Sequence, residues 1–348
     1  MSPTPLSDTG VVVIGRNEGE RLRRCLTSCR GHARRIVYAD SGSTDGSCAL
    51  ARELGAEVVE LDLSRPANAA RGRNAGLERL LELEPDLPCC FFIDGDCELA
   101  DGFLEAARAE LVGEPGLGGV CGRRREIDPG ASLFNRLVDA EWNTPLGATE
   151  ACGGDALFRV AALRATGGYD EGMSCGEDPE LSHRIRRQGF GLLRIEHEMT
   201  RHDVALHRFG PWWKRHARGG YAYMHGCAKH WGEPGNYNRR TCLSIVLYGL
   251  FLPLVCLASL PLFLVGHGGV PVVTTALAAA AYLRLWIRVR CFRRDQGDDA
   301  RSAGVYAAFV VLGKFAELQG LASCLFDLAL GRRSLVCEYK DYQRRAAA

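Results

Sequence analysis

Short apolar runs alternate with amphipathic stretches along the N-terminal part of the chain. Val11–Ile14 is a β-branched run, and Leu22 and Leu26 then recur at helical spacing. The same alternation continues with expected strands at 35–39, 57–61 and 90–93, and with expected helices through 50–54 and 73–83. Strands that alternate with helices form βαβ crossovers. The pattern therefore predicts an α/β fold with a doubly wound, mostly parallel, Rossmann-like sheet.

The pattern changes near residue 240. From Cys242 to Val265 there is no charged side chain, and a helix of that length can cross the hydrocarbon core of a membrane. A glycine-rich break at 266–269 follows, and 270–283 is again apolar, with Arg284 close enough to its end to snorkel. A buried helical hairpin in a soluble domain would not need so long and uniform an apolar run. We expect a transmembrane helical hairpin over 241–290.

Charges around the hairpin predict its orientation. Arg239 and Arg240 precede the first span, and four arginines follow the second within 288–294, which places both ends in the cytoplasm. A third apolar stretch, 305–330, contains Lys314, Glu317 and Asp327. An in-plane or re-entrant amphipathic helix suits these charges, and a third span is the alternative. The expected domains are therefore 1–205, an amphipathic connector at 206–240, the hairpin at 241–290, and an interfacial or third membrane helix with a basic tail at 291–348.

Composition limits the partners and the compartment. Lys and Arg total 43 against 42 Asp and Glu, which argues against a nucleic-acid partner. The 15 cysteines are scattered and form no pair of CxxC knuckles, so we expect reduced, buried thiols. No basic-then-apolar leader precedes the first strand, so a cleaved signal is not expected. These features predict an inner-membrane protein whose N-terminal domain faces the cytoplasm.

Polar side chains follow the expected strands where each of them ends. Asp94 and Asp96 follow the apolar run 89–93 at a spacing that places both on one side of an extended backbone. Asn17 and Asp40 also follow strands, and ligands of such sheets bind at the carboxyl ends of strands. Mg²⁺ or Mn²⁺ with a diphosphate requires such carboxylates. After Asp40, Ser43 or Thr44 is expected to cap the next helix.

Two further acidic motifs follow. One is Gly153–Asp155, which could also be an ordinary hairpin turn. The other is Glu177–Asp178, which opens a helical pattern through Leu181 and Ile185. Acidic residues in a first turn often only complement the helix dipole.

Five motifs occur in an order that resembles a known family. They are Val11–Glu18 (VVVIGRNE), Tyr38–Ser47 (YADSGSTDGS), Ala70–Gly76 (ARGRNAG), Ile93–Cys97 (IDGDC), and GGYDE at 167–171 with GEDPELSHRI at 176–185. The series resembles the family-2 glycosyltransferases of GT-A fold, which are inverting enzymes that use nucleotide-diphospho sugars. The similarity covers roughly residues 9 to 205.

The resemblance implies a role for each matching residue. On the donor side it implies that Asp40 accepts a hydrogen bond from the nucleobase, that Arg73 reaches the nucleotide, and that Asn17 and Glu18 also bind substrate. Ser41 stands where the family usually has a second acid. A capped turn remains the alternative for 40–45, and a surface salt bridge for Arg73.

On the catalytic side, the resemblance implies that Asp96 holds Mg²⁺ or Mn²⁺, with Asp94 at the ribose or sugar and near the ion. His202 could approach the metal or the diphosphate. The implied acceptor-side turn is Gly153, Gly154 and Asp155. Glu177 would orient the loop or the donor, and Asp178 would be the general base.

The sequence therefore predicts a membrane-anchored, metal-dependent hexosyl- or glycosyltransferase. It would move one sugar from a nucleotide-diphospho sugar to a saccharide or lipid-linked acceptor in envelope or exopolysaccharide biosynthesis. A polyprenyl-phosphate glycosyltransferase is the alternative enzyme, and a catalytically silent, nucleotide-sugar-binding membrane scaffold is the alternative of another class. The GlnXXArgTrp motif of processive synthases and the glycine-rich loop of sugar nucleotidyltransferases are not found in the sequence.

Overall fold

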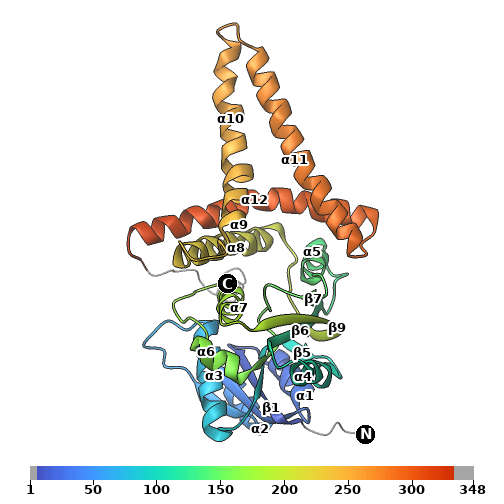
Figure 1. Cartoon of the computed structure of the whole chain (residues 1–348), viewed down its shortest axis with the longest axis vertical. Coiled ribbons are helices and arrows are strands. Elements are labelled where there is room, and N and C mark those ends of the chain that lie inside the picture. Colours follow the sequence, from blue (N-terminus) through green and yellow to red (C-terminus); the bar gives the residue numbers. More distant parts are fainter. Residues whose placement is uncertain (1–5, 333–348) are drawn as a thin grey trace. The chain divides into compact units, whose positions relative to one another are not determined.

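The computed structural model describes residues 6–332 of the chain. They form two compact units, the first ending at Ala205 and the second beginning at Leu206. Figure 1 shows the strands gathered in the first unit and long helices in the second.

The first unit is built on one nine-stranded mixed sheet in the order β3-β2-β1-β4-β8-β6-β9-β5, with β7 paired to β9. β1 pairs in parallel with β2 and β4, β2 with β3, and β6 with β9, whereas β8, β5 and β7 pair antiparallel with their neighbours. The predicted doubly wound α/β fold is confirmed, and the antiparallel pairs make its sheet mixed. The strands are β1 (Leu6–Gly15), β2 (Ala33–Asp40), β3 (Glu57–Glu60), β4 (Cys89–Asp94), β5 (Cys97–Leu99), β6 (Leu117–Glu126), β7 (Gly147–Ala148), β8 (Ala156–Arg159) and β9 (Gly191–His202).

Helices connect these strands, and their apolar faces complete the core. The central strands are buried from Thr9 to Ile14 in β1 and from Cys89 to Ile93 in β4, as expected for parallel strands covered on both faces. Buried residues of α1, α3 and α4 pack into the same core. The helices are α1 (Glu20–Cys29), α2 (Ser47–Glu53), α3 (Ala69–Leu83), α4 (Phe103–Gly113), α5 (Leu133–Trp142), α6 (Val160–Thr166) and α7 (Glu177–Arg187).

The predicted cap of α2 is wrong. The helix starts after Gly46, which takes a left-handed conformation, and neither Ser43 nor Thr44 caps it. Ser43 instead donates its hydroxyl to Asp40, which fixes the preceding turn. Asp45 accepts hydrogen bonds from the backbone N–H and the hydroxyl of Ser47 at the first turn of α2. A carboxylate one residue before the glycine therefore replaces the expected hydroxyl cap.

The second unit is helical. It comprises α8 (Phe209–Lys229), α9 (Arg239–Val246), a π-helical turn η1 (Leu247–Phe251), α10 (Leu252–Ser259), a 3₁₀ turn η2 (Leu260–Phe263), α11 (Gly269–Asp295) and α12 (Ala300–Ala329). In Figure 1, α10 and α11 form a hairpin and α12 runs across its foot beside α8. Three segments are long and apolar enough to cross a membrane, namely Arg239–Phe263, Gly269–Asp295 and Ala300–Ala329.

Small residues allow α8 and α12 to pack with their backbones close together. A Cβ added to Gly220 of α8 would collide with the backbone of Glu317, and one added to Gly320 of α12 would collide with that of Ala217. Within this interface, the Tyr221 hydroxyl donates to Asp327 across 3.2 Å. One face of α12 is therefore covered by another helix of the same unit.

Candidate active site

Asp94 and Asp96 flank a tight turn at the carboxyl end of β4. The backbone N–H of Gly95 donates to the Ile14 carbonyl at 2.7 Å, and a Cβ at Gly95 would lie only 3.0 Å from that oxygen. A side chain at position 95 would push the turn away from β1. Glycine therefore lets the two carboxylates be held against the end of the neighbouring parallel strand.

Arg73 of α3 joins three of the predicted site carboxylates. Its Nη2 lies 3.0 Å from Asp94 Oδ1, and its Nη1 lies 2.8 Å from Glu177 Oε1 and 3.1 Å from Asp178 Oδ1. The guanidinium also stacks over the Tyr169 ring, 5.3 Å from its centroid. The Arg73 side chain is only 2% exposed, so it is not a surface salt bridge. It ties the end of β4 to the start of α7.

Arg124 of β6 forms a second bridge, which the sequence interpretation missed. Its Nη2 lies 2.6 Å from Asp155 Oδ2 and 3.2 Å from Asp94 Oδ2, and its guanidinium stacks over Trp142. The fully buried Asp155 also accepts from the Thr200 hydroxyl at 2.5 Å and from the backbone N–H of Asp94 at 3.1 Å. Asp155 is thus engaged on both oxygens, and its observed contacts position Asp94.

The predicted glycine turn lies directly against this cluster. A Cβ at Gly154 would be 2.6 Å from Arg73 Nη2, 3.2 Å from Asp94 Oδ2 and 3.5 Å from Asp178 Oδ2. At Gly153, by contrast, an added Cβ would meet nothing within 4 Å. The two glycines therefore differ: Gly154 makes room for the charged groups, and Gly153 is open to solvent.

The charges of this cluster do not balance. Arg73 and Arg124 are two positive groups among four carboxylates, those of Asp94, Asp155, Glu177 and Asp178. Burial, together with the like charges of Glu177 and Asp94, raises the pKa of Asp178 to about 8, although Arg73 opposes the shift. Burial likewise raises the pKa of Asp94, although Arg73 opposes it. An excess of buried negative charge favours binding of a cation or a proton.

Asp96 points to a different partner. Its Oδ1 lies 3.3 Å from His202 Nε2 at the end of β9. Burial alone would raise the pKa of Asp96, but His202, Arg21 and Arg124 together outweigh it, and the pKa falls to about 2. Donor atoms of Asp96, Cys97 and His202 lie within 4.8 Å of one another, as do those of Asp94, Cys97 and Asp155. Carboxylate oxygens suit Mg²⁺ or Mn²⁺, and imidazole is a common metal ligand, so Asp96 and His202 could hold the predicted ion.

Asp40 is placed at the carboxyl end of β2, but its carboxylate is already occupied. Oδ1 accepts from the Tyr38 and Ser43 hydroxyls at 2.8 and 2.5 Å, and Oδ2 accepts from the backbone N–H groups of Gly42 and Ser43 at 2.9 and 2.7 Å. Burial raises the pKa of Asp40, but these hydrogen bonds outweigh it and hold the pKa below its usual value. Four donors fill the acceptor sites of a carboxylate. In this structure Asp40 therefore anchors the turn.

Asn17 and Glu18 lie beside that turn. Asn17 takes a positive φ of 56°, its backbone N–H donates to Ser43 Oγ, and its Oδ1 accepts from the backbone N–H of Thr44, both at 2.8 Å. Glu18 is buried and pairs with Arg21 at 3.0 Å. Asn17 joins the loops that follow β1 and β2 at the carboxyl ends of these strands.

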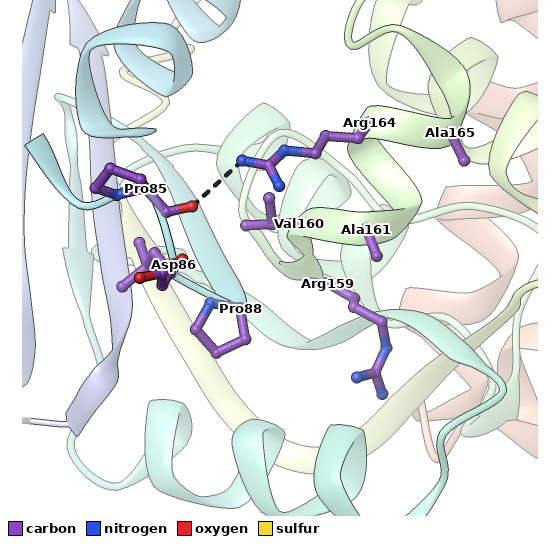
Figure 2. A pocket seen from close by; sticks show the side chains of 9 residues that line it. Pro85, Asp86, Pro88, Arg159, Val160, Ala161, Arg164 and Ala165 are labelled. Carbon is purple, nitrogen blue, oxygen red and sulfur yellow. Dashed lines mark hydrogen bonds between the residues drawn. The ribbon is translucent and has the colours of Figure 1, made fainter. Parts of the chain in front are cut away.

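A pocket outlined by the structure lies away from this cluster. It is lined by the loop 85–88, by Arg159, and by residues of α6 that include Val160 and Arg164, as Figure 2 shows. Arg164 donates to the Pro85 carbonyl across it at 3.3 Å. This loop precedes β4, whereas Asp94 ends that strand, so the pocket lies at the opposite end of β4 from the acidic cluster.

Comparison with known proteins identifies the domain that carries the cluster. Residues 10–163 match the family described as Glycosyl transferase family 2. The chain contains a glycosyl transferase family 2 domain. The match includes Asp40, Arg73, Asp94, Asp96 and the glycine turn, and the predicted resemblance is confirmed.

Two curated relatives support this assignment. The succinoglycan biosynthesis protein ExoA of Rhizobium meliloti (strain 1021) is 32% identical over 189 residues, covering 50% of this chain and 54% of ExoA. The pre-mycofactocin glycosyltransferase of Mycobacterium tuberculosis (strain ATCC 25618 / H37Rv) is 27% identical over 211 residues, covering 56% of this chain and 43% of that protein. The chain thus spans about half the length of the curated relatives it matches.

A solved structure shows the same fold. The mannosyltransferase PcManGT from Pyrobaculum calidifontis, in complex with GDP-Man and Mn²⁺, aligns with a TM-score of 0.55 at 17% identity, covering 94% of this chain and 90% of PcManGT. At this identity the similarity concerns the fold alone, which is the predicted GT-A type.

Proposed function

We propose that this family-2 domain is a metal-dependent, inverting glycosyltransferase anchored in a membrane. It transfers one sugar from a nucleotide-diphospho sugar to an acceptor hydroxyl in envelope or exopolysaccharide biosynthesis. The proposal rests mainly on one observation: the buried Arg73 holds the partly exposed Asp94 and Asp178 in one cluster, although they are far apart in the sequence. The family match and the relatives in succinoglycan and mycofactocin biosynthesis support it.

Asp178 is the general base of the proposed reaction. Its carboxylate takes the proton of the acceptor hydroxyl as that oxygen attacks the anomeric carbon, and the bond from this carbon to the diphosphate breaks. A base works best when its pKa is near the working pH, and the pKa of Asp178 is about 8. Its side chain is 20% exposed, so an acceptor can reach it. Arg73 orients this carboxylate at the first turn of α7.

Asp96 and His202 would hold the divalent cation, and Asp94 would be a further carboxylate near it. When bound, Mg²⁺ or Mn²⁺ supplies positive charge that stabilises the departing diphosphate. Arg124 and Asp155 keep Asp94 in place at the end of β4. Asn17, Glu18 and Asp40 shape the nucleotide end of the site. If the hydrogen bond from the Ser43 hydroxyl to Asp40 Oδ1 breaks, that oxygen can accept a hydrogen bond from the nucleobase.

The second unit anchors the enzyme in the inner membrane, with the family-2 domain in the cytoplasm. Helices α9–α10 and α11 form the spanning hairpin. Helix α12 lies in the membrane plane, because α8 covers one of its faces and because Lys314 and Glu317 pair within it at 2.6 Å. A third span is the competing arrangement, and it would place the C-terminal end of α12 outside.

The test is a screen of nucleotide sugars with the full-length protein in detergent or vesicles. Metal-dependent release of the nucleoside diphosphate, reduced by chelator and by Asp96→Ala, is expected for one donor. Acceptor arms with a lipid-linked saccharide and with a polyprenyl phosphate distinguish the two acceptor classes by the product formed. Donor binding without release or transfer for any pair would contradict the proposal and favour the scaffold alternative.

A further inference from the structure

Cys97 lies beside the proposed cation ligands. It follows Asp96 directly and begins β5, which pairs antiparallel with β9 so that Cys97 stands opposite His202. Paired residues on neighbouring strands project to the same face of a sheet. The Cys97 sulfur lies 3.8 Å from Asp96 Oδ1, the oxygen that is also 3.3 Å from His202 Nε2.

The Cys97 sulfur also lies close to two separate groups of ionisable side chains. It belongs to both clusters of donor atoms lying within 4.8 Å of one another, one with Asp96 and His202 and the other with Asp94 and Asp155. Cys97 is fully buried in the first unit. A buried cysteine is ordinarily only a small apolar side chain in a core. This one instead adds a sulfur donor to an oxygen and a nitrogen donor.

That donor set changes which ions the site accepts. Mg²⁺ and Mn²⁺ prefer oxygen ligands, whereas thiolate favours softer ions, and a Cys–His–carboxylate combination suits Zn²⁺. We propose that Cys97 is a metal ligand, and that Asp96, Cys97 and His202 bind a thiophilic divalent ion such as Zn²⁺ or Co²⁺. This inference deepens the cation site of the proposed function and rests on it. On binding, the metal–sulfur bond forms and the thiol proton passes to the buffer.

The proposal has a functional consequence. Zn²⁺ binds nitrogen, oxygen and sulfur sites more tightly than Mn²⁺ does. Zn²⁺ held by three protein groups, including a thiolate, leaves fewer positions for a diphosphate than Mn²⁺ held by oxygen and nitrogen alone. Zn²⁺ is therefore expected to displace Mn²⁺ and inhibit transfer, and this inhibition should weaken when Cys97 is replaced.

Cobalt spectroscopy tests the ligand directly. Metal-free, full-length protein is titrated with Co²⁺ while the near-ultraviolet band of thiolate-to-cobalt charge transfer is recorded. We expect a band that saturates with one equivalent and disappears in Cys97→Ser. Cys90→Ser is the matched control, because Cys90 is equally buried on β4 but belongs to neither donor cluster. His202→Gln leaves the thiol in place and should also remove the band, which keeps the test open if Cys97→Ser does not fold.

Affinities provide the second measurement. Loss of outer-shell partners alone costs about 10–100-fold in metal affinity. Zn²⁺ binding should therefore weaken at least about tenfold in Cys97→Ser, whereas Mn²⁺ binding should change little. Co²⁺ binding without a thiolate band, or a band that survives both Cys97→Ser and His202→Gln, would overturn the proposal. If Mn²⁺-dependent transfer persists in that case, the proposed function stands without it.

Discussion

Replacing Gly154 by alanine should damage catalysis, whereas the same change at Gly153 should not. The new Cβ at 154 would lie 2.6 Å from Arg73 Nη2, and ordinary van der Waals contact begins at 3.4 Å, so the guanidinium must retreat by 3.4 − 2.6 = 0.8 Å. Arg73 cannot move freely, because it is buried and bound to Asp94, Glu177 and Asp178. Neither glycine has a positive φ, so alanine fits the backbone at both positions.

The magnitude follows from that displacement. A misplacement of about 1 Å at reacting groups can cost about 10²-fold in rate, so kcat of Gly154→Ala should fall by about that factor. Overpacking of a buried site should also lower the free energy of unfolding by about 1–3 kcal/mol. For Gly153→Ala, kcat should be unchanged and the free energy of unfolding should move by less than about 0.5 kcal/mol, because the added Cβ meets nothing within 4 Å.

The assay measures kcat and the KM values for donor and acceptor in both variants, together with thermal unfolding. An effect of Gly153→Ala confined to the acceptor KM is compatible with an acceptor that passes close to this turn. Equal kcat values for the two variants would refute the view that Gly154 exists to admit the Arg73 cluster. A kcat that is lower in Gly153→Ala than in Gly154→Ala would refute the same view.

Four further predictions follow from the same geometry. Asp178→Asn should keep donor affinity while transfer falls by about 10²–10⁴-fold in rate assays, and near-normal transfer would require another base. Because Asp178 must be ionised to act, kcat/KM should rise with pH with a midpoint at about 8. Glu177→Gln removes a like charge and should therefore move this midpoint to lower pH. An unchanged midpoint in Glu177→Gln would contradict the assignment of Asp178 as the base. Asp96→Ala should abolish Mn²⁺-dependent donor binding and lower transfer by on the order of a thousandfold, and undiminished turnover with chelator present would exclude Asp96 as the metal ligand. In intact cells a membrane-impermeant maleimide should not label the exposed Cys291 near the end of α11, but should label it after permeabilisation, and labelling from outside would reverse the proposed orientation.

Local sequence alone determined much of the fold. The first four strands and several helices of the first unit follow from short-range patterns, such as the buried run before Asp94, the helical spacing in α1 and α3, and the acidic start of α7 at Glu177. The apolar run after Cys242 likewise predicted a helix long enough to span a membrane. Such patterns are readable because each element must bury one face or stripe of its own residues.

Tertiary structure decided how the site is assembled. Arg124 stands in an unremarkable basic run of β6, and only the pairing of β6 with β8 and β9 brings it to Asp155. The register of β5 on β9 places Cys97 opposite His202, although more than a hundred residues separate them. Similarly, alanine is expected to be tolerated at position 153 but not at 154, because the guanidinium of Arg73 from α3 lies against Gly154 and not against Gly153. Long-range contacts depend on strand register and packing, which no local pattern contains, and these contacts determine which charged groups share one buried site.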